Sequence, residues 1–283
     1  MATRPRPRRR SGRARRRNQA SDLGARVWIA VPAAVYAIAI IVAGGWVFAL
    51  GILLLGLVCL HELFRLYEPV RPIKLAGFLG LIGLTAAAHF GGEHQVLLAT
   101  VVQFPLVFLL GLVMPERPEA RLTPAMAFTL FGALWIGLAV AHGVLLRDSP
   151  HGDGIVVDVL VGTFIGDTAA YLGGRAFGTR RLAPRVSPNK TVEGLVFGVL
   201  GAILAVWCAG LYQDWLAGWD ALILGAVVGV VAPIGDLFES KVKRDADAKD
   251  AGTLFGAHGG ALDRLDAALF TLVAGYYVWQ ALS

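Results

Sequence analysis

Charged residues and cysteines are both scarce in this sequence. Asp, Glu, Lys and Arg make up 16% of its 283 residues, whereas a typical soluble domain carries about 25%. Hydrophobic residues reach 56%, so the chain is too apolar for an ordinary soluble domain and its solvent is expected to be largely lipid. The two cysteines, Cys59 and Cys208, lie inside apolar runs with no Cys/His cluster near them. Neither a disulfide framework nor a zinc site is therefore indicated.

Positive charge is concentrated at the start of the chain. Ten of the 26 Lys and Arg residues fall within the first 26 positions, in a segment rich in Pro, Arg and Ser. This composition predicts that residues 1–26 form a disordered basic tail. We expect the tail to lie near anionic lipid headgroups on the cytoplasmic side, and we expect no nucleic-acid partner. No cleavable signal peptide is expected, because the first apolar stretch leads directly into further spans.

Nine apolar stretches follow the tail, each close to the roughly 20 residues that a helix needs to cross a bilayer. We place them at residues 27–44, 45–61, 73–89, 95–114, 124–146, 155–174, 191–212, 219–235 and 262–282. If the N-terminus is cytoplasmic, 25 of the 26 Lys and Arg residues fall on the cytoplasmic side and only Arg147 falls outside. Because short cytoplasmic loops are enriched in these residues, the sequence predicts an all-α polytopic integral membrane protein with about nine transmembrane helices. Its C-terminus is then outside, and residues 27–283 form a single membrane domain.

Carboxylates in or beside membrane helices are costly, so each of them needs a partner or a function. Six are found in the last four spans or at their ends: Asp158, Asp167, Glu193, Asp236, Asp263 and Asp266. Each one alone is compatible with an interhelical hydrogen bond or a position that water reaches. Together they cluster toward the cytoplasmic ends of these spans and predict a polar site within about residues 160–270.

Two stretches hold most of the polar residues of this region. The first, residues 166–194, contains the segment SPNKT (187–191) just before an apolar span. Free backbone N–H groups at a helix start, hydroxyl groups and a cation suit a phosphate. An N-cap at Asn189 with Lys190 reaching toward the interface is a compatible alternative. The second stretch, residues 235–266, places carboxylates beside cations, as a metal-bound nucleoside triphosphate requires.

The order of residues in the two stretches resembles the phosphatidate cytidylyltransferase family, also called CDP-diglyceride synthases. The family signature is a Ser, then Lys-Arg, Lys-Asp, His-Gly-Gly and Asp-Arg-x-Asp. The chain matches it with Ser240, Lys243-Arg244, Lys249-Asp250, Gly252, Phe255, Gly256, His258-Gly259-Gly260, Asp263-Arg264 and Asp266. It departs at Ala261, where the family usually has a larger aliphatic residue, and we expect this to alter loop packing rather than chemistry. The resemblance covers roughly the last 120 residues, and the first five spans match only in hydropathy.

This resemblance implies an enzyme of phospholipid biosynthesis that converts CTP and phosphatidate into CDP-diacylglycerol and diphosphate. It implies a multi-pass protein of the cell membrane with its site facing the cytoplasm, a Mg²⁺ cofactor with a second cation left open, and a homodimer. We expect the metal to be held by Asp167, Asp236, Asp250, Asp263 and Asp266. Substrate binding is assigned to Arg175, Ser187, Asn189, Lys190, Thr191, Ser240, Lys243 and Arg244, and a catalytic role to Lys249, Asp250, His258, Asp263 and Arg264. His258 either donates to a phosphate oxygen or orders the Gly-Gly turn.

Three other functions were weighed against this hypothesis. A transporter for an anionic solute would place ionisable groups near the bilayer midplane, whereas the polar groups here crowd one face. A CTP-dependent polyprenol kinase would share a nucleotide site but release CDP instead of diphosphate. An alcohol phosphatidyltransferase is expected to carry the string Asp-Gly-x-x-Ala-Arg, which this sequence lacks.

Overall fold

The computed structural model describes residues 31–113, 121–216, 218–252 and 259–283. The chain divides into two compact units, Met1–Ala39 and Ile40–Ser283. Of the expected first span, 27–44, the described part forms a helix over Val31–Ala43. The expected disordered tail, residues 1–26, lies outside the described residues.

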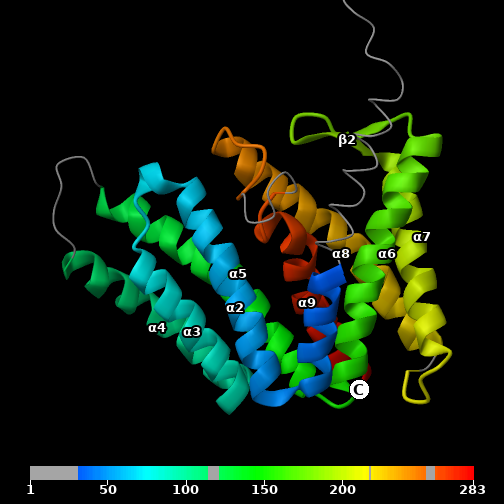
Figure 1. Ribbon diagram of the computed structural model, residues 1–283, viewed down its shortest axis with the longest axis horizontal. Coiled ribbons are helices and arrows are strands. Elements are labelled where there is room, and N and C mark those ends of the chain that lie inside the picture. Colours follow the sequence, from blue (N-terminus) through cyan, green and yellow to red (C-terminus); the bar gives the residue numbers. More distant parts are fainter. Residues whose placement is uncertain (1–30, 114–120, 217, 253–258) are drawn as a thin grey trace, which may run out of the picture. The chain divides into compact units, whose positions relative to one another are not determined.

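The second unit is built from long apolar helices (Figure 1). In the described part of the chain, eight helices are long and apolar enough to cross a membrane. These are α2 (Gly45–Leu66), α3 (Lys74–Gly91), α4 (Glu93–Val113), α5 (Leu122–Asp148), α6 (Gly152–Phe177), α7 (Val192–Gly210), α8 (Gly218–Asp245) and α9 (Leu262–Leu282). Each one overlaps a span expected from hydropathy, so the prediction of an all-α polytopic membrane protein is confirmed. Which side of the membrane each terminus occupies stays a prediction.

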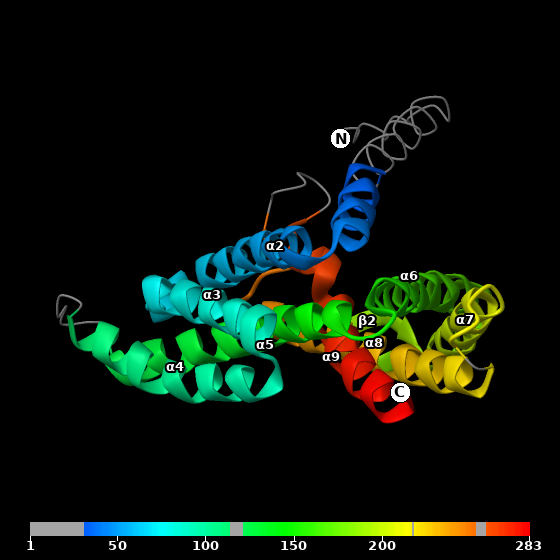
Figure 2. The same cartoon turned by 90° about the horizontal axis from the view of Figure 1, so that it is seen from below.

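The eight helices form two halves that meet along one seam. In the N-terminal half α5 packs against α2, α3 and α4, and in the C-terminal half α7 lies between α6 and α8 while α9 packs on α8. The halves join mainly where α5 lies along α9, which Figure 2 shows in the middle of the unit. Small residues permit close helix contacts in the C-terminal half, since a Cβ on Gly198 of α7 would be 3.2 Å from the Gly166 carbonyl oxygen of α6.

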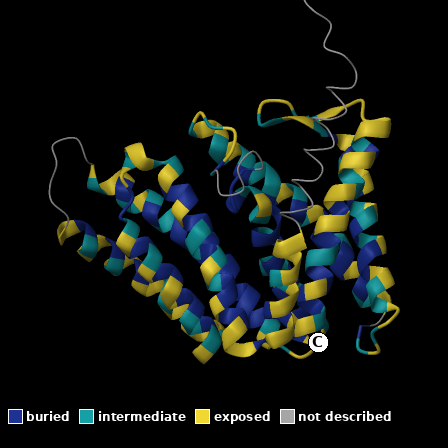
Figure 3. Cartoon of the chain, viewed as in Figure 1, coloured by how far each residue is buried: buried dark blue, intermediate teal, exposed yellow. Residues whose placement is uncertain are grey.

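The helices leave many apolar side chains on the outside (Figure 3). On α4, for example, Leu97, Val101 and Leu109 are exposed. Buried residues such as Leu60, Leu81 and Ile136 lie between the helices instead. Because lipid tails are as apolar as these side chains, an exposed apolar face is the expected surface of a membrane-spanning helix.

Two features differ from the expected spans. The eighth span was expected to end at residue 235, but α8 continues as a helix to Asp245, so the segment from Asp236 to Arg244 is helical and not a loop. The second difference is a hairpin of two antiparallel strands, β1 (Arg181–Ala183) and β2 (Ser187–Thr191), which joins α6 to α7. A short 3-10 helix, η1 (Glu68–Val70), also joins α2 to α3.

Candidate functional site

One end of the second unit carries the hairpin, and we call it the hairpin end. Here α2, α6 and α8 finish, and α7 and α9 begin. The β2 residue Lys190 forms an ion pair with Asp236 of α8, and both side chains are partly exposed. The two polar stretches of the sequence are therefore brought together at this end.

Asp236 of this ion pair lies near two further carboxylates, which come from two other helices. Asp236 of α8 and Asp167 of α6 are close enough to interact electrostatically with each other, and both interact with Asp266 of α9. We call Asp167, Asp236 and Asp266 the carboxylate cluster. Ser240, one helical turn beyond Asp236, donates a weak hydrogen bond of 3.4 Å from Oγ to the Asp236 Oδ1. Because like charges repel, the cluster favours a nearby cation, and Lys190 supplies one.

The meeting of α8 and α9 depends on Gly235. A Cβ on this residue would lie only 2.7 Å from the backbone oxygen of Asp266 and 3.1 Å from Cα of Ala267. A larger residue would force α8 and α9 apart next to Asp236 and Asp266. Gly235 thus permits the two carboxylates to lie close together.

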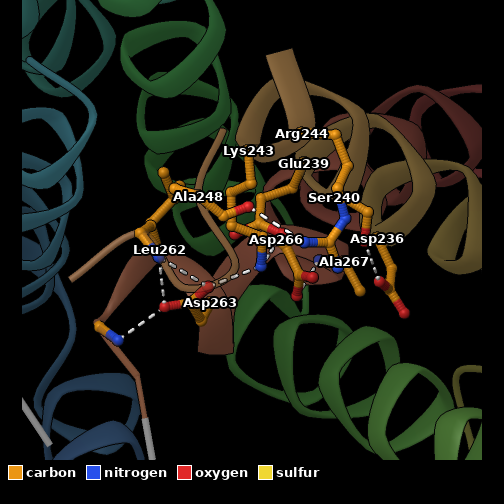
Figure 4. A network of polar contacts seen from close by, with 12 residues as sticks. Asp236, Glu239, Ser240, Lys243, Arg244, Ala248, Leu262, Asp263, Asp266 and Ala267 are labelled. Carbon is orange, nitrogen blue, oxygen red and sulfur yellow. Dashed lines mark hydrogen bonds and ion pairs between the residues drawn. The ribbon is translucent and has the colours of Figure 1, made fainter. Parts of the chain in front are cut away.

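Lys243 lies in a second group of charges beside the carboxylate cluster (Figure 4). Its Nζ is 2.6 Å from Glu239 Oε2 on the same helix and 2.6 Å from Asp263 Oδ1 on α9. The Glu239 side chain is 1% exposed and the Lys243 side chain 12%. Buried charges are tolerated when they are paired. Because Lys243 of α8 pairs with Asp263 of α9, it also joins α8 to the start of α9. Lys243 was expected to bind substrate, whereas Glu239 was not expected in the site.

Asp263 organises the loop between α8 and α9. Its carboxylate accepts hydrogen bonds from the Ala251 N–H at 2.9 Å and from the Gly260 N–H at 2.7 Å, as well as from Lys243. These two N–H groups belong to residues before and after 253–258. One carboxylate therefore binds the loop backbone on both sides of that segment. The oxygens of Asp263, which was expected to be a metal ligand, are therefore bonded to Lys243 and to the loop backbone.

Glu62 of α2 and Tyr67, just after α2, also reach the start of α9 and the end of α8, although neither was expected in the site. Glu62 Oε2 accepts a hydrogen bond from the Leu262 N–H at 2.9 Å, and the Tyr67 hydroxyl donates to the Val242 carbonyl oxygen at 2.8 Å. Burial raises the pKa of Tyr67, with a smaller contribution from the negative charge of Asp245. The Tyr67 hydroxyl consequently stays protonated and able to donate. The one available signal was a carboxylate directly after the expected end of the second span, at residue 61.

The other residues expected in the site differ in how firmly they are held. Thr191 is buried and caps α7, because its Oγ1 accepts the Gly194 N–H at 3.1 Å. The alternative N-cap at Asn189 is therefore wrong. Ser187 is half-buried in β2, while Asn189, Arg175, Arg244, Lys249, Asp250 and Arg264 are exposed at the hairpin end. Arg175 Nη1 donates to the Tyr171 hydroxyl at 3.3 Å and Arg244 Nη1 to the Ala248 carbonyl at 3.1 Å. His258 lies outside the described residues.

Two of the six membrane carboxylates have hydrogen-bond partners outside the carboxylate cluster. Asp158 is fully buried near the start of α6, and its Oδ1 accepts a hydrogen bond from Gln213 Nε2 at 3.1 Å. It lies toward the end of α6 opposite the hairpin, so its expected place in the polar site is wrong. Glu193 accepts hydrogen bonds from the hydroxyl and N–H of Thr179 and from the Arg180 N–H. It fixes the start of the hairpin.

The carboxylate cluster offers oxygen ligands of the kind that Mg²⁺ takes, but it is not a complete set of metal ligands. Within the described ranges, no group of three or more His, Cys, Asp or Glu side chains is arranged to hold a metal ion. Magnesium takes oxygen ligands and usually keeps several waters, binding through one or two carboxylates together with substrate phosphates. Asp236 and Asp266, with Asp167 beside them, fit that mode of binding, whereas the Asp263 oxygens already accept three hydrogen-bond donors.

Comparison with known proteins gives a consistent assignment. Residues 24–282 match the model of the cytidylyltransferase family. The chain is 29% identical to a phosphatidate cytidylyltransferase of Synechocystis over 89% of the chain and 94% of that protein. It is 28% identical to the phosphatidate cytidylyltransferase of Bacillus subtilis over 91% of the chain and 97% of that protein. Over 53% of the chain and 56% of the relative, identity to the Brucella suis phosphatidate cytidylyltransferase is 38%. The chain therefore belongs to the cytidylyltransferase family.

Proposed function

We propose that this membrane protein transfers the cytidylyl group of CTP to phosphatidate, which yields CDP-diacylglycerol and diphosphate. Support comes from the family match over residues 24–282 and from relatives of nearly equal length that are named for this activity. The observation that carries the proposal is the meeting of Lys190 with the carboxylate cluster, because it joins two distant polar stretches into one site for phosphates.

The reaction asks little covalent chemistry of the protein. A phosphate monoester is largely dianionic near neutral pH, since its second pKa is about 6, so phosphatidate needs no strong general base. One of its phosphate oxygens forms a bond to the α-phosphorus of CTP. The bond from this phosphorus to the oxygen that bridges to the β-phosphorus breaks, and diphosphate leaves with the electron pair. Catalysis then consists of positioning the substrates and neutralising charge.

Cations of the hairpin end would perform the neutralisation. Lys190 is partly exposed and could exchange an Asp236 oxygen for a phosphate oxygen. Arg175, Arg244, Lys249 and Arg264 are exposed at the hairpin end and would pair with a bound triphosphate or lipid headgroup. Lys243 is held more deeply between Glu239 and Asp263, and it acts on substrate only if one of these pairs opens.

Magnesium is proposed as the cofactor, held by Asp236 and Asp266 with Asp167 nearby. When bound, it would offset the charge that develops on the leaving diphosphate. The chain's own contribution is to keep these carboxylates close together through the contact at Gly235, and to balance their charge with Lys190.

The hairpin end is proposed to face the cytoplasm of the cell, where CTP is found. Lys and Arg residues concentrate in the connections at this end, as expected for cytoplasmic loops. The acyl chains of phosphatidate would stay among or beside the apolar helices while its headgroup meets the nucleotide at the interface. A homodimer is part of the same proposal and rests on the resemblance alone.

The test is transfer of label from CTP to lipid. The purified protein in mixed micelles is given CTP labelled at the α-phosphate, with and without phosphatidate and Mg²⁺. Label entering the lipid phase with equimolar diphosphate, only when both are added, supports the proposal. Release of CDP would instead indicate a kinase, and intact CTP with a folded protein would overturn the enzyme assignment in favour of transport.

A further inference from the structure

Glu62 lies in the site although its helix carries none of the family signature. Its side chain comes from α2 and is buried, and it bonds to a residue 200 positions later in the chain. Removing a carboxylate from water costs free energy unless hydrogen bonds replace the lost solvation. A buried Glu near the end of a mainly apolar helix therefore needs a specific partner, and the structure shows one.

The partner is the beginning of α9. Leu262 is the first residue of this helix, and the preceding residue, Ala261, has no polar side chain that could cap it. The first N–H groups of a helix lack partners within the helix, and the positive end of its dipole favours a negative charge. By accepting the Leu262 N–H at 2.9 Å, Glu62 caps α9 from a different helix. It thereby fixes where the helix bearing Asp263 and Asp266 begins.

Glu62 also accounts for two glycines of the family signature. A Cβ on Gly252 would lie 2.9 Å from Cγ of Glu62 and closer still to its carboxylate, and a Cβ on Gly260 would overlap the same carboxylate. Real Cβ atoms do not approach other atoms this closely. The two glycines stand on either side of residues 253–258, so the loop backbone passes against Glu62 both before and after that segment.

A second contact from the end of α2 supports the first. The Tyr67 hydroxyl donates to the carbonyl oxygen of Val242, the residue before Lys243. The end of α2 thus bonds to α9 through Glu62 and to α8 through Tyr67. Since Lys243 joins the same two helices through Asp263, α2 braces the site from the other half of the molecule.

We propose that Glu62 is a positioning residue for the nucleotidyl transfer. This role rests on the proposed function. Glu62 holds the start of α9 and the loop backbone, and through them it sets the places of Asp263 and Asp266 relative to Asp236 and Lys243. It acts through these residues and does not itself touch the substrates.

The first test compares Glu62→Leu with Glu62→Gln. Leu keeps the volume and removes the acceptor, whereas Gln keeps one oxygen that can accept the Leu262 N–H. Glu62→Leu should lower kcat for label transfer at least tenfold and change the KM values for CTP and phosphatidate by less than about threefold, because mispositioning costs more in the transition state than in binding. Glu62→Gln should stay within about threefold of the wild type.

The matched control is Glu68→Gln, which changes an exposed glutamate that pairs with Lys74 at 2.6 Å just beyond the same helix. It should retain full activity. If the wild type transfers label and Glu62→Leu stays within twofold in kcat, the positioning role is overturned while the proposed function stands. If the wild type transfers no label, it is the proposed function that fails.

A second test does not require Glu62→Leu to fold. Gly252→Ala places a methyl group where the Glu62 carboxylate lies and should lower kcat at least tenfold. Adding Glu62→Asp withdraws the carboxylate by one methylene group and should recover at least threefold. If the fold-change in kcat of the double variant equals the product of the two single fold-changes, the proposal is overturned. Gly83→Ala is the control, since a Cβ on Gly83 of α3 meets no atom within 4 Å.

Discussion

The two halves of the membrane unit differ sharply in what their sequences show. The C-terminal half, α6 to α9, carries the signature, the hairpin and the carboxylate cluster, whereas the N-terminal half, α2 to α5, is marked only by its apolar spans. Nevertheless the halves are joined by side-chain hydrogen bonds at both ends of their seam. At the hairpin end these come from Glu62 and Tyr67. At the opposite end the Tyr276 hydroxyl donates to Glu93 at 2.6 Å, and His142 Nε2 lies 3.0 Å from the Tyr277 hydroxyl.

A half that carries no sequence motif can therefore still supply hydrogen bonds that hold the site together. The residues proposed to meet substrate are gathered in two stretches of the sequence, because the hairpin, one loop and the helix ends beside them present these residues together. Residues that hold this arrangement only need a single acceptor or donor at the right place, and they leave no pattern in the sequence. Substitutions in both halves can test whether the N-terminal half contributes to turnover only through its hairpin end.

The largest effect is expected for Asp263→Asn, within the C-terminal half. Asn replaces one acceptor oxygen with an NH₂ group, so Lys243 or the Ala251 and Gly260 N–H groups lose part of their charged partner. Hydrogen bonds to charged groups are worth about 1.5–3 kcal/mol each, and about 2.7 kcal/mol corresponds to about 100-fold in rate. We therefore expect turnover to fall by about 100-fold in the label-transfer assay.

Asp214→Asn serves as its control, because Asp214 is exposed in the connection between α7 and α8, at the opposite end. Thermal unfolding in detergent should show that both variants are folded. Turnover of Asp263→Asn within threefold of the wild type would mean that the loop does not need this clamp.

The next effect concerns the joining of the two polar stretches. Lys190→Met keeps most of the side-chain length but leaves Asp236 facing Asp167 and Asp266 without its cation. We expect turnover to fall at least tenfold, and the Mg²⁺ concentration needed for half-maximal turnover to change, because the metal and Lys190 neutralise the same carboxylates. Arg185→Met removes an exposed cation from the turn of the same hairpin and should change neither quantity by more than about twofold. Equal effects of the two changes would contradict a specific role for Lys190.

These residues also show which parts of the fold and of the site can be predicted from the sequence. Hydropathy predicts the spans because each helix must meet lipid along its own length, which is a local property. The end of α8 was missed because seven of its last ten residues, 236–245, are polar or charged, although they continue the helix beyond its apolar part. Asp158 was misplaced although it lies near the start of the 155–174 span, beside the connection that holds Arg147, and the expected topology already puts that end of the span outside. Glu62 was not found, since the partner that it has among the described residues lies 200 residues away and is a backbone N–H.

A smaller effect is expected from two identical substitutions at opposite ends of the seam. Tyr67→Phe removes the hydrogen bond to Val242, and Tyr276→Phe removes the one to Glu93. Tyr67→Phe should lower the free energy of unfolding by about 1 kcal/mol, as for a typical hydrogen bond, and Tyr276→Phe by about 1.5–3 kcal/mol, because its acceptor is a carboxylate. Turnover should fall about threefold for Tyr67→Phe and stay unchanged for Tyr276→Phe. If both variants lost turnover in proportion to stability, the two ends of the seam would not differ in function.

The smallest effect is expected where the positive charge is densest. Deleting residues 1–20 removes most of the Arg-rich segment, whose expected role is to lie near anionic headgroups, where each Lys or Arg contributes about 1 kcal/mol of attraction. Such attraction helps to place the chain at the membrane but does not position groups for transfer, so turnover in neutral mixed micelles should stay within about twofold. Assays at low and high salt should show the same small ratio, since micelles without anionic lipid offer the tail little to bind. A loss beyond tenfold, about 1.4 kcal/mol in the barrier, would show that the start of the chain takes part in the reaction and that the N-terminal side contributes more than its contacts at the hairpin end.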